Sequence, residues 1–206
     1  MNPIKFSYTP EDNNLTGFAS NVTGATWTIS DTTVGDGLAH QVTIRNDSAT
    51  DHSGKTALLT GTDSDGLTQT ETITLPGVSA TVTSTKYWAT LVTAVPSATI
   101  GADTMDIGWN DVAIGPTFPL NWRQQDFQGT LGVNISGTIN YTLQYCLDPL
   151  YSSGYPSTLT WWNHDTLASL TADAQSNFAF PVTATRVLVN SLTAGATIAL
   201  HIVQGN

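Results

Sequence analysis

The chain has 206 residues and a formal net charge of −10, from six lysines and arginines against sixteen aspartates and glutamates. The six cations are scattered singly, which argues against nucleic acid and against an anionic membrane surface as partners. Charged residues make up 11% of the chain, well below the usual share of about a quarter. Threonine, serine, asparagine and glutamine supply the polarity instead, and β-branched threonine favours sheet over helix.

The N-terminal segment MNPIKFSYTPEDNN has neither a basic region nor an apolar core, so we expect no secretory signal and synthesis in a cytoplasm. No run of about 20 apolar residues occurs, so no transmembrane helix is expected. The polar cluster 11–14 is predicted to lie on the surface. The single cysteine, Cys146, excludes an intrachain disulfide and a multi-cysteine zinc site, and we expect it to be a partly buried apolar residue.

The first half alternates short β-type runs with turn clusters. We predict strands at 25–30, 41–45, 55–61, 67–75, 80–84, 87–95 and 104–109. The strongest signal is the pair of runs around Asp65-Gly66, because glycine accepts the positive φ that tight hairpin turns need. Seven short strands with frequent turns predict a β-sandwich.

Residues 110–119 interrupt this pattern with two prolines and a glycine, which places a domain boundary there. We therefore predict an all-β chain of two consecutive antiparallel β-sandwich or jelly-roll-like domains, an N-terminal one over 1–116 and a smaller one over 117–206. Strands of the second domain are predicted at 129–135, 138–147, 159–162, 177–182, 186–190 and 197–204. The stretch 167–175 has the length of a short helix.

The run DSDG at 63–66 resembles part of a calcium loop, but position 12 of such a loop needs a bidentate glutamate and is Thr74 here. A hairpin turn explains the same residues better. The four histidines are far apart in the sequence, and none forms a metal-ligand pair at short spacing. We interpret His164 as part of a surface turn and expect His201 to point outward from its strand, toward a neighbouring subunit.

The sequence contains no G-x-S-x-G elbow and no glycine-rich phosphate loop with a lysine. A pair of carboxylates for glycoside hydrolysis would meet only in space, but the chain has only two glutamates, Glu11 and Glu71. We therefore predict no catalytic, cofactor-binding or metal-binding residues and a non-enzymatic protein without a cofactor. A polysaccharide-degrading enzyme that uses aspartates is the competing hypothesis from another class.

Aromatic residues are the remaining candidates for function. Trp161 and Trp162 are adjacent, so in a strand they point to opposite faces and cannot share one core. Trp109, Phe118 and Trp122 gather around the predicted boundary. Either one tryptophan of the pair packs inside while the other covers a domain edge, or these aromatic residues form a subunit interface. All five are taken as the candidate interface.

Two groups of segments stand out beyond their strand pattern. The first is GTDSDGLTQTETITLPG, followed by TVTSTKYWATLVTAV and MDIGW. The second is NYTLQYCLDP, followed by TWWNHDTLASLTADAQSNFAFPVTATRVLVNS and ALHIVQ. Together the two groups draw on both halves of the chain, and they resemble structural proteins of tailed-bacteriophage particles.

The resemblance implies a capsid decoration protein of the cement or head-fibre-like type. Such a protein is non-enzymatic, forms a homotrimer and binds the major capsid protein on the outer surface of the virion, where it reinforces the shell. Many copies on one closed shell make a modest affinity per site sufficient. The alternative is a tail, neck or adhesin component of the virion that binds a receptor or glycan.

Overall fold

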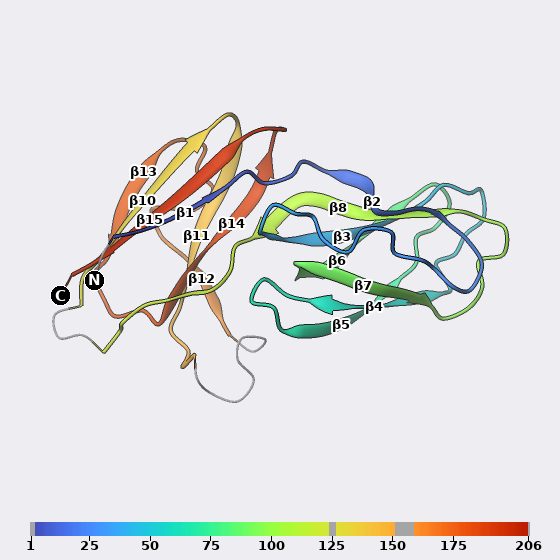
Figure 1. Ribbon diagram of the computed structural model, residues 1–206, viewed down its shortest axis with the longest axis horizontal. Coiled ribbons are helices and arrows are strands. Elements are labelled where there is room, and N and C mark those ends of the chain that lie inside the picture. The colour runs from blue at the N-terminus through green and yellow to red at the C-terminus, as the bar shows by residue number, and fades with distance from the viewer. Residues whose placement is uncertain (1–2, 124–126, 151–158, 206) are drawn as a thin grey trace. The chain divides into compact units, whose positions relative to one another are not determined.

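The computed structural model describes residues 3–123, 127–150 and 159–205 (Figure 1). Within these residues the protein is all-β, with strands paired antiparallel in several sheets and no helix. The fold class expected from the sequence is confirmed. It follows from the low charge and high threonine content, which suit a pleated surface better than a helical one.

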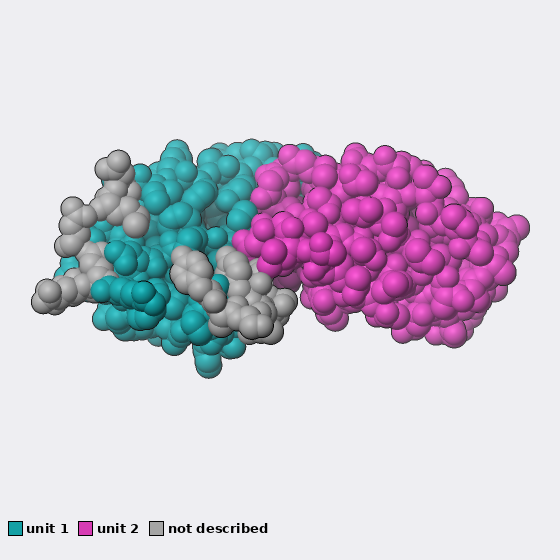
Figure 2. All heavy atoms as spheres, turned by 60° about the horizontal axis from the view of Figure 1, so that its bottom comes forward, with its two compact units in different colours: residues 1–11, 114–206 teal, residues 12–113 magenta. Residues whose placement is uncertain are grey.

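The chain divides into two compact units, which Figure 2 shows in different colours. Residues 12–113 form one unit, here called the inserted unit, and residues 1–11 with 114–206 form the other, called the split unit. The observed boundary after residue 113 lies close to the predicted one after 116. The predicted assignment of residues 1–11 differs, because the first strand pairs with the last strand of the chain rather than with its neighbours in sequence. The units are therefore nested in sequence rather than consecutive.

The inserted unit is a two-layer sandwich (Figure 1). One layer has β8 (Met105–Ile114) with β2 (Asn14–Val22) on one side, and on the other β3 (Ala39–Asn46) followed by β6 (Thr81–Trp88). The second layer has β4 (Thr56–Thr62) between β5 (Thr68–Thr74) and β7 (Thr90–Pro96). Its buried core includes Phe18, Val42, Leu59, Trp88 and Ile107.

The split unit also has two sheets. The first runs in the order β1 (Ile4–Tyr8), β15 (Thr197–Gln204), β10 (Gly129–Ser136) and β13 (Ala174–Phe178). The second runs β12 (Trp161–Asn163), β11 (Ile139–Cys146) and β14 (Ala184–Leu192), with the short β9 (Phe118–Pro119) also on β14. In β15 the residues Ile198, Leu200 and Ile202 are buried and their neighbours are more exposed, which is the alternation that a half-buried strand requires.

Two strands, β1 and β2, lie in the first 24 residues, where the sequence analysis predicts no strand. β1 has a clean alternation of apolar and polar residues, but the flanking Pro3 and Pro10 weaken its signal. β2 lacks an alternation, because irregularities on both sides of Ala19 shift its register against β8. The polar cluster 11–14 between them is exposed, as predicted.

Three local predictions are wrong. The run 25–30 is not a strand: Trp27 is buried there, but the bonds to β2, such as that from the Ser30 N–H to the Phe18 carbonyl at 2.9 Å, do not form a strand pairing. The strand predicted at 177–182 is β13, which ends at residue 178. The stretch 167–175 is not a helix, because Ser169 has a φ of 55° and Leu170 exchanges hydrogen bonds with Tyr141 of β11.

The predicted hairpin around Asp65-Gly66 is confirmed, with Thr62 opposite Thr68 across a five-residue connection. The carboxylate of Asp63 accepts the backbone N–H groups of Asp65 and Leu67, each at 2.9 Å. Gly66 adopts a φ of 78°, which a residue with a Cβ rarely takes. The run 63–66 is thus a turn closed by its own first side chain, as the hairpin interpretation predicts.

Close backbone approach makes one glycine of β8 indispensable. A Cβ added to Gly108 would lie 1.9 Å from the carbonyl oxygen of Asn14, because β2 passes directly over this point of the strand. Backbone atoms cannot move aside as the end of a flexible side chain can. Close packing of β2 on β8 therefore requires glycine here.

We predict that Gly108→Ala destabilises the protein by about 3 kcal/mol, because β2 must be displaced to make room for the methyl group. The matched control is Gly54→Ala, since nothing lies within 4 Å of the Cβ that this substitution adds. It should change stability by less than about 1 kcal/mol. Urea unfolding followed by tryptophan fluorescence measures both, and equal values for the two variants would contradict the prediction.

A charged contact ties three strands of the inserted unit together at Asp106. Its carboxylate, 3% exposed, lies 2.6 Å from the guanidinium of Arg45 and accepts the backbone N–H of Asn21 at 2.9 Å. Burial by itself raises the pKa of Asp106, but the hydrogen bonds from the Asn21 N–H and the Arg45 guanidinium, together with the positive charge of Arg45, outweigh it and hold the pKa below its ordinary value of 3.8. The charged form is therefore favoured in the folded state.

A lowered pKa in the folded state means that ionised Asp106 stabilises the protein above its ordinary value of 3.8, and that this stabilisation is lost as the pH falls through the lower folded value. Asp106→Asn should cost about 2 kcal/mol at neutral pH and reduce the fall of stability in acid. Urea unfolding across the acid range tests this. An unchanged acid slope in the variant would contradict the assignment.

Candidate functional site

The five predicted interface residues belong to two different units, with Trp109 in the inserted unit and the other four in the split unit. Trp109 belongs to the core of the inserted unit, where it packs edge-on against Phe18 and donates its indole N–H to the Asp12 carbonyl at 3.0 Å. Phe118 is half-buried in the split unit, with its ring centre 5.1 Å from that of Phe6. Trp109 is therefore a structural residue of its unit.

The remaining three candidates, Trp122, Trp161 and Trp162, are tryptophans of the split unit. Trp161 is half-buried against Cys146 and Ala184, and the Arg186 guanidinium stacks on its ring at 4.1 Å. Trp162 is 53% exposed and Trp122 is 38% exposed. Within the adjacent pair, Trp161 is thus partly covered and Trp162 is open to solvent, so neither ring is fully buried. Cys146 itself is fully buried.

A broad uncharged surface covers the outer side of the sheet β5-β4-β7, and we call it the threonine face. Strand alternation directs every second side chain of these strands outward, and the register aligns them in rows. One row contains Thr72, Leu58 and Val95, and the next contains Thr70, Thr60 and Thr93. The full set is Thr56, Leu58, Thr60, Thr62, Thr68, Thr70, Thr72, Thr74, Thr90, Thr93 and Val95.

The threonine face combines exposure with an absence of charge among its members. Leu58 is 44% and Val95 52% exposed, and Val92 beside them is 54% exposed at a register shift of β7. In the sequence, this hairpin stands out for its Asp65-Gly66 turn and not as a binding site. Its signal is the repeated T-x-T spacing, which matters only once both neighbouring strands prove to carry it on the same side.

The charged side chain of β5 points to the other side of that sheet and closes the sandwich edge. Glu71 accepts the backbone N–H groups of Thr85 and Lys86, at 2.8 and 3.1 Å, together with the Thr85 hydroxyl at 2.9 Å. Lys86 in turn donates its ammonium group to the Thr70 carbonyl at 2.8 Å. These bonds link β5 to β6 across the two layers. One of the two glutamates in the chain thus has a structural role.

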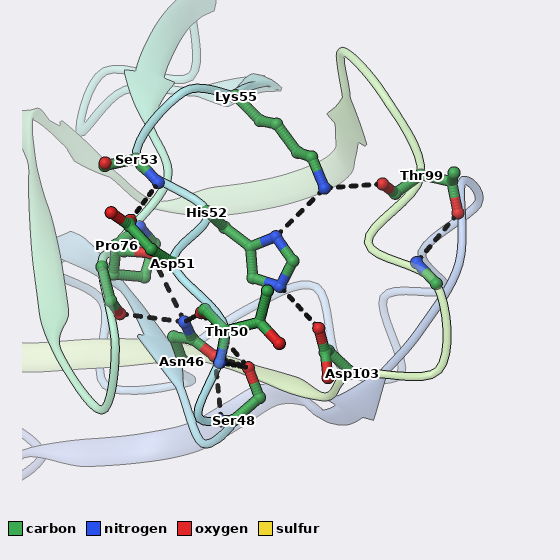
Figure 3. Close-up of polar contacts among 12 residues, drawn as sticks. Asn46, Ser48, Thr50, Asp51, His52, Ser53, Lys55, Pro76, Thr99 and Asp103 are labelled. Atoms are coloured by element: carbon green, nitrogen blue, oxygen red, sulfur yellow. Dashed lines mark hydrogen bonds and ion pairs between the residues drawn. The ribbon is translucent and has the colours of Figure 1, made fainter.

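A polar network around His52 joins two loops of the inserted unit (Figure 3). The ring is 2% exposed, and its Nε2 lies 3.0 Å from the Asp103 carboxylate. Its Nδ1 lies 3.1 Å from the ammonium nitrogen of Lys55, which also donates to the Thr99 carbonyl at 2.8 Å. An ammonium group only donates, so Nδ1 accepts and Nε2 carries the proton that is given to Asp103.

The hydrogen bonds that run from Lys55 through His52 to Asp103 resemble a proton relay, but they act as a structural cross-link. Both ring nitrogens are engaged, and the lysine that would be the reactive group is fixed by a ring nitrogen and a backbone carbonyl. The neighbouring Asn46 pins the same loop by donating to the carbonyls of Thr50 and Gly77, at 2.8 and 2.9 Å. The arrangement fixes the loop that leads into β4.

The other histidines also have structural environments. His40 is buried, with one ring nitrogen 2.7 Å from Asp36 and the other 2.9 Å from the Asn110 carbonyl, so both ring nitrogens have a partner within the fold. The turn predicted at His164 is present, with the Leu167 N–H 3.2 Å from the His164 carbonyl, but the His164 side chain is 7% exposed and so does not lie on the surface. Its ring bridges the Thr166 N–H and the Asn177 carbonyl. His201 is partly exposed on β15.

Paired carboxylates were the feature that the enzyme hypothesis required. Asp12 and Asp111 both accept the Asn13 N–H, at 2.9 and 2.8 Å. Burial raises the pKa of Asp111, and the nearby Asp12 adds to this. Because both carboxylates bind this one N–H, we interpret the pair as fixing the backbone where the chain enters β2. Elsewhere in the described residues, no group of three or more histidine, cysteine or acidic side chains is arranged to hold a metal ion.

Comparison with known proteins yields no relative: neither protein-family models, nor curated proteins, nor solved structures match this chain. Among the residues that the structure describes, no helix has both the length and the apolar character of a membrane span. The arguments on function therefore rest on the surfaces of the two units.

We predict that His52→Ala destabilises the protein by about 2 kcal/mol, because it leaves Asp103 and Lys55 without their shared partner in a buried site. His201→Ala is the matched control, because this ring is partly exposed on an outward strand position, and it should cost less than about 0.5 kcal/mol. Thermal unfolding monitored by circular dichroism compares them. Full stability of the His52 variant would contradict a cross-linking role.

Proposed function

We propose that this chain is a non-enzymatic structural protein of a tailed-phage particle that decorates the outer surface of the capsid and reinforces the shell. The observation that carries the proposal is the threonine face, an exposed and uncharged side of a three-stranded sheet. The resemblance of the sequence to virion proteins directs the choice of partner, which is the major capsid protein. The protein acts in this role through adhesion and shape.

The chemistry of the threonine face supports adhesion to another protein. Threonine is β-branched and stiff at χ1, so it loses little side-chain freedom when it is covered. A long flexible side chain would instead cost about 0.5–1.5 kcal/mol when immobilised in an interface. The methyl groups of threonine, with Leu58 and Val95, offer apolar area, and the hydroxyls offer hydrogen bonds in the same plane.

The distribution of charge supports the same conclusion. The chain carries a net charge of −10, which keeps copies apart in solution and opposes non-specific contact. The threonine face contains none of that charge, so it can approach an acidic partner, or sit beside many identical copies, with little repulsion. Because a closed shell offers many equivalent positions, weak contacts of this kind suffice for reinforcement.

Copy number per particle tests the assignment directly. Quantitative mass spectrometry of purified particles, with cryo-electron microscopy of their surface, is expected to find hundreds of copies spread over the shell. A handful of copies at one vertex would instead favour the tail, neck or adhesin alternative. Turnover of host polysaccharide by the purified chain, measured as released reducing sugar, would overturn the non-enzymatic proposal.

We predict that Leu58→Asp weakens binding of the purified chain to capsids that lack it by at least about tenfold, because it places an unpaired charge in the centre of the threonine face. Val203→Asp is the matched control, since Val203 is 43% exposed on β15, in the other unit. Co-sedimentation with the particles measures both variants. Equal binding of the Leu58 variant and the wild type would contradict a role for this face.

The uncharged face also predicts that capsid binding depends little on salt. Raising the ionic strength from about 0.05 to about 0.5 M should change the dissociation constant by less than about threefold, because screening acts on charges. A steep loss of binding in the same co-sedimentation assay would indicate that charged residues elsewhere on the chain make the contact.

A further inference from the structure

A groove opens in the split unit between the end of β11, the turn after β12, and β13 with the residues that follow it. Its volume is about 220 Å³, and its lining includes Tyr145, His164, Asp165, Asn177 and Phe180. All of these residues belong to one compact unit. The groove is separate from the threonine face, which lies on the inserted unit.

Aromatic rings form the walls of this groove. The ring of Tyr145 lies edge-on to two phenylalanines, 5.7 Å from Phe178 and 5.6 Å from Phe180 between ring centres. Phe178 is buried, whereas Phe180 is 45% exposed. Trp162 of β12 is opposite Tyr145 in the strand register and is 53% exposed. Cross-strand partners point to the same face of a sheet, so the indole extends the aromatic surface beside the groove.

The floor of the groove is fixed by hydrogen bonds. The ring of His164 accepts the Thr166 N–H at 3.2 Å and donates to the Asn177 carbonyl at 3.3 Å. The hydroxyl groups of Thr166 and Ser176 are 2.8 Å apart. These bonds tie the turn after β12 to β13, so the groove does not have to be assembled when a ligand arrives, and less freedom is lost on binding.

Free polar groups complete the lining. Within the described part of the chain, the side chains of Asp165 and Asn177 and the hydroxyl of Tyr145 have no hydrogen-bond partner or ion pair. A carboxylate accepts, an amide accepts and donates, and a phenol does both. The groove thus offers hydrogen-bonding groups that the fold itself does not use, next to aromatic surface that the fold leaves exposed.

We propose that this groove is a binding site for an uncharged sugar ring. A pyranose has one face of C–H groups that packs on an aromatic ring and a rim of hydroxyl groups that both donate and accept, and the groove offers a counterpart to each. The volume suits a single ring or the end of a glycan rather than a larger ligand. The inference goes beyond capsid decoration and does not depend on it.

The charge and the ring arrangement of the groove favour an uncharged sugar over other ligands. An anionic sugar or a phosphate is opposed by Asp165, and the described residues that line the groove include no lysine or arginine. A quaternary ammonium group is attracted by carboxylates and ring faces, but it is bound best inside a cage of several rings that present their faces. Phe178 is buried and edge-on to Tyr145, so it does not complete such a cage.

Ligand-observed saturation-transfer NMR on the full chain tests the proposal. The probes are glucose, galactose, N-acetylglucosamine and their β-1,4-linked disaccharides, each at up to about 10 mM, with tetramethylammonium as the cationic probe. At least one uncharged sugar should bind with a dissociation constant of about 1 mM. Phe180→Ala should weaken this binding by at least about tenfold, and Asp165→Asn by a smaller factor.

Trp122→Ala is the matched control, because it removes an exposed tryptophan of the same unit that does not line the groove. It should bind the sugar as the wild type does, and so should Leu58→Asp, which separates this site from capsid binding. The proposal is overturned if no sugar binds, if only tetramethylammonium binds, or if Phe180→Ala and Trp122→Ala behave alike. Circular dichroism of each variant verifies that it is folded.

Discussion

The structure depends on one constraint, the burial of a single side of each sheet between two layers. In both units most inward residues are aliphatic or aromatic and buried, and the outward residues alternate with them. Burial of that apolar area, at about 25 cal/mol per Å², is the dominant favourable term. The outward side chains are therefore not needed for the core, so they are free to bind other molecules.

Sandwiches of this kind must also manage their edges, since unpaired strands attract other chains. The inserted unit closes one edge with Glu71 and Lys86, which connect β5 to β6 through backbone groups. The split unit places β1, taken from the other end of the sequence, beside β15. That pairing adds a fourth strand to the sheet and explains why the inserted unit interrupts the split unit in sequence.

The polar side chains inside the protein are mostly committed to its architecture. His52 and Asn46 fix loops of the inserted unit, and His164 fixes the turn beside the groove. Two places differ from this pattern: the threonine face, which is exposed and uncharged, and the groove beside Tyr145, where polar groups and aromatic surface are left unused. Both proposals of function follow from these exceptions, one for a protein partner and one for a sugar.

The sequence alone was enough for the all-β class, the hairpin around Gly66, most strands from residue 39 onward and the interruption of the strand pattern at 110–119, because alternation and turn residues are local signals. Only the tertiary structure decided that β1 joins β15, that β2 pairs through bulges, and that 167–175 follows β11 instead of coiling. It also decided the sites. Trp109 is buried against Phe18, and threonines from three strands share one face. Both contacts depend on how strands far apart in the sequence pair, which the spacing of residues within one strand does not encode.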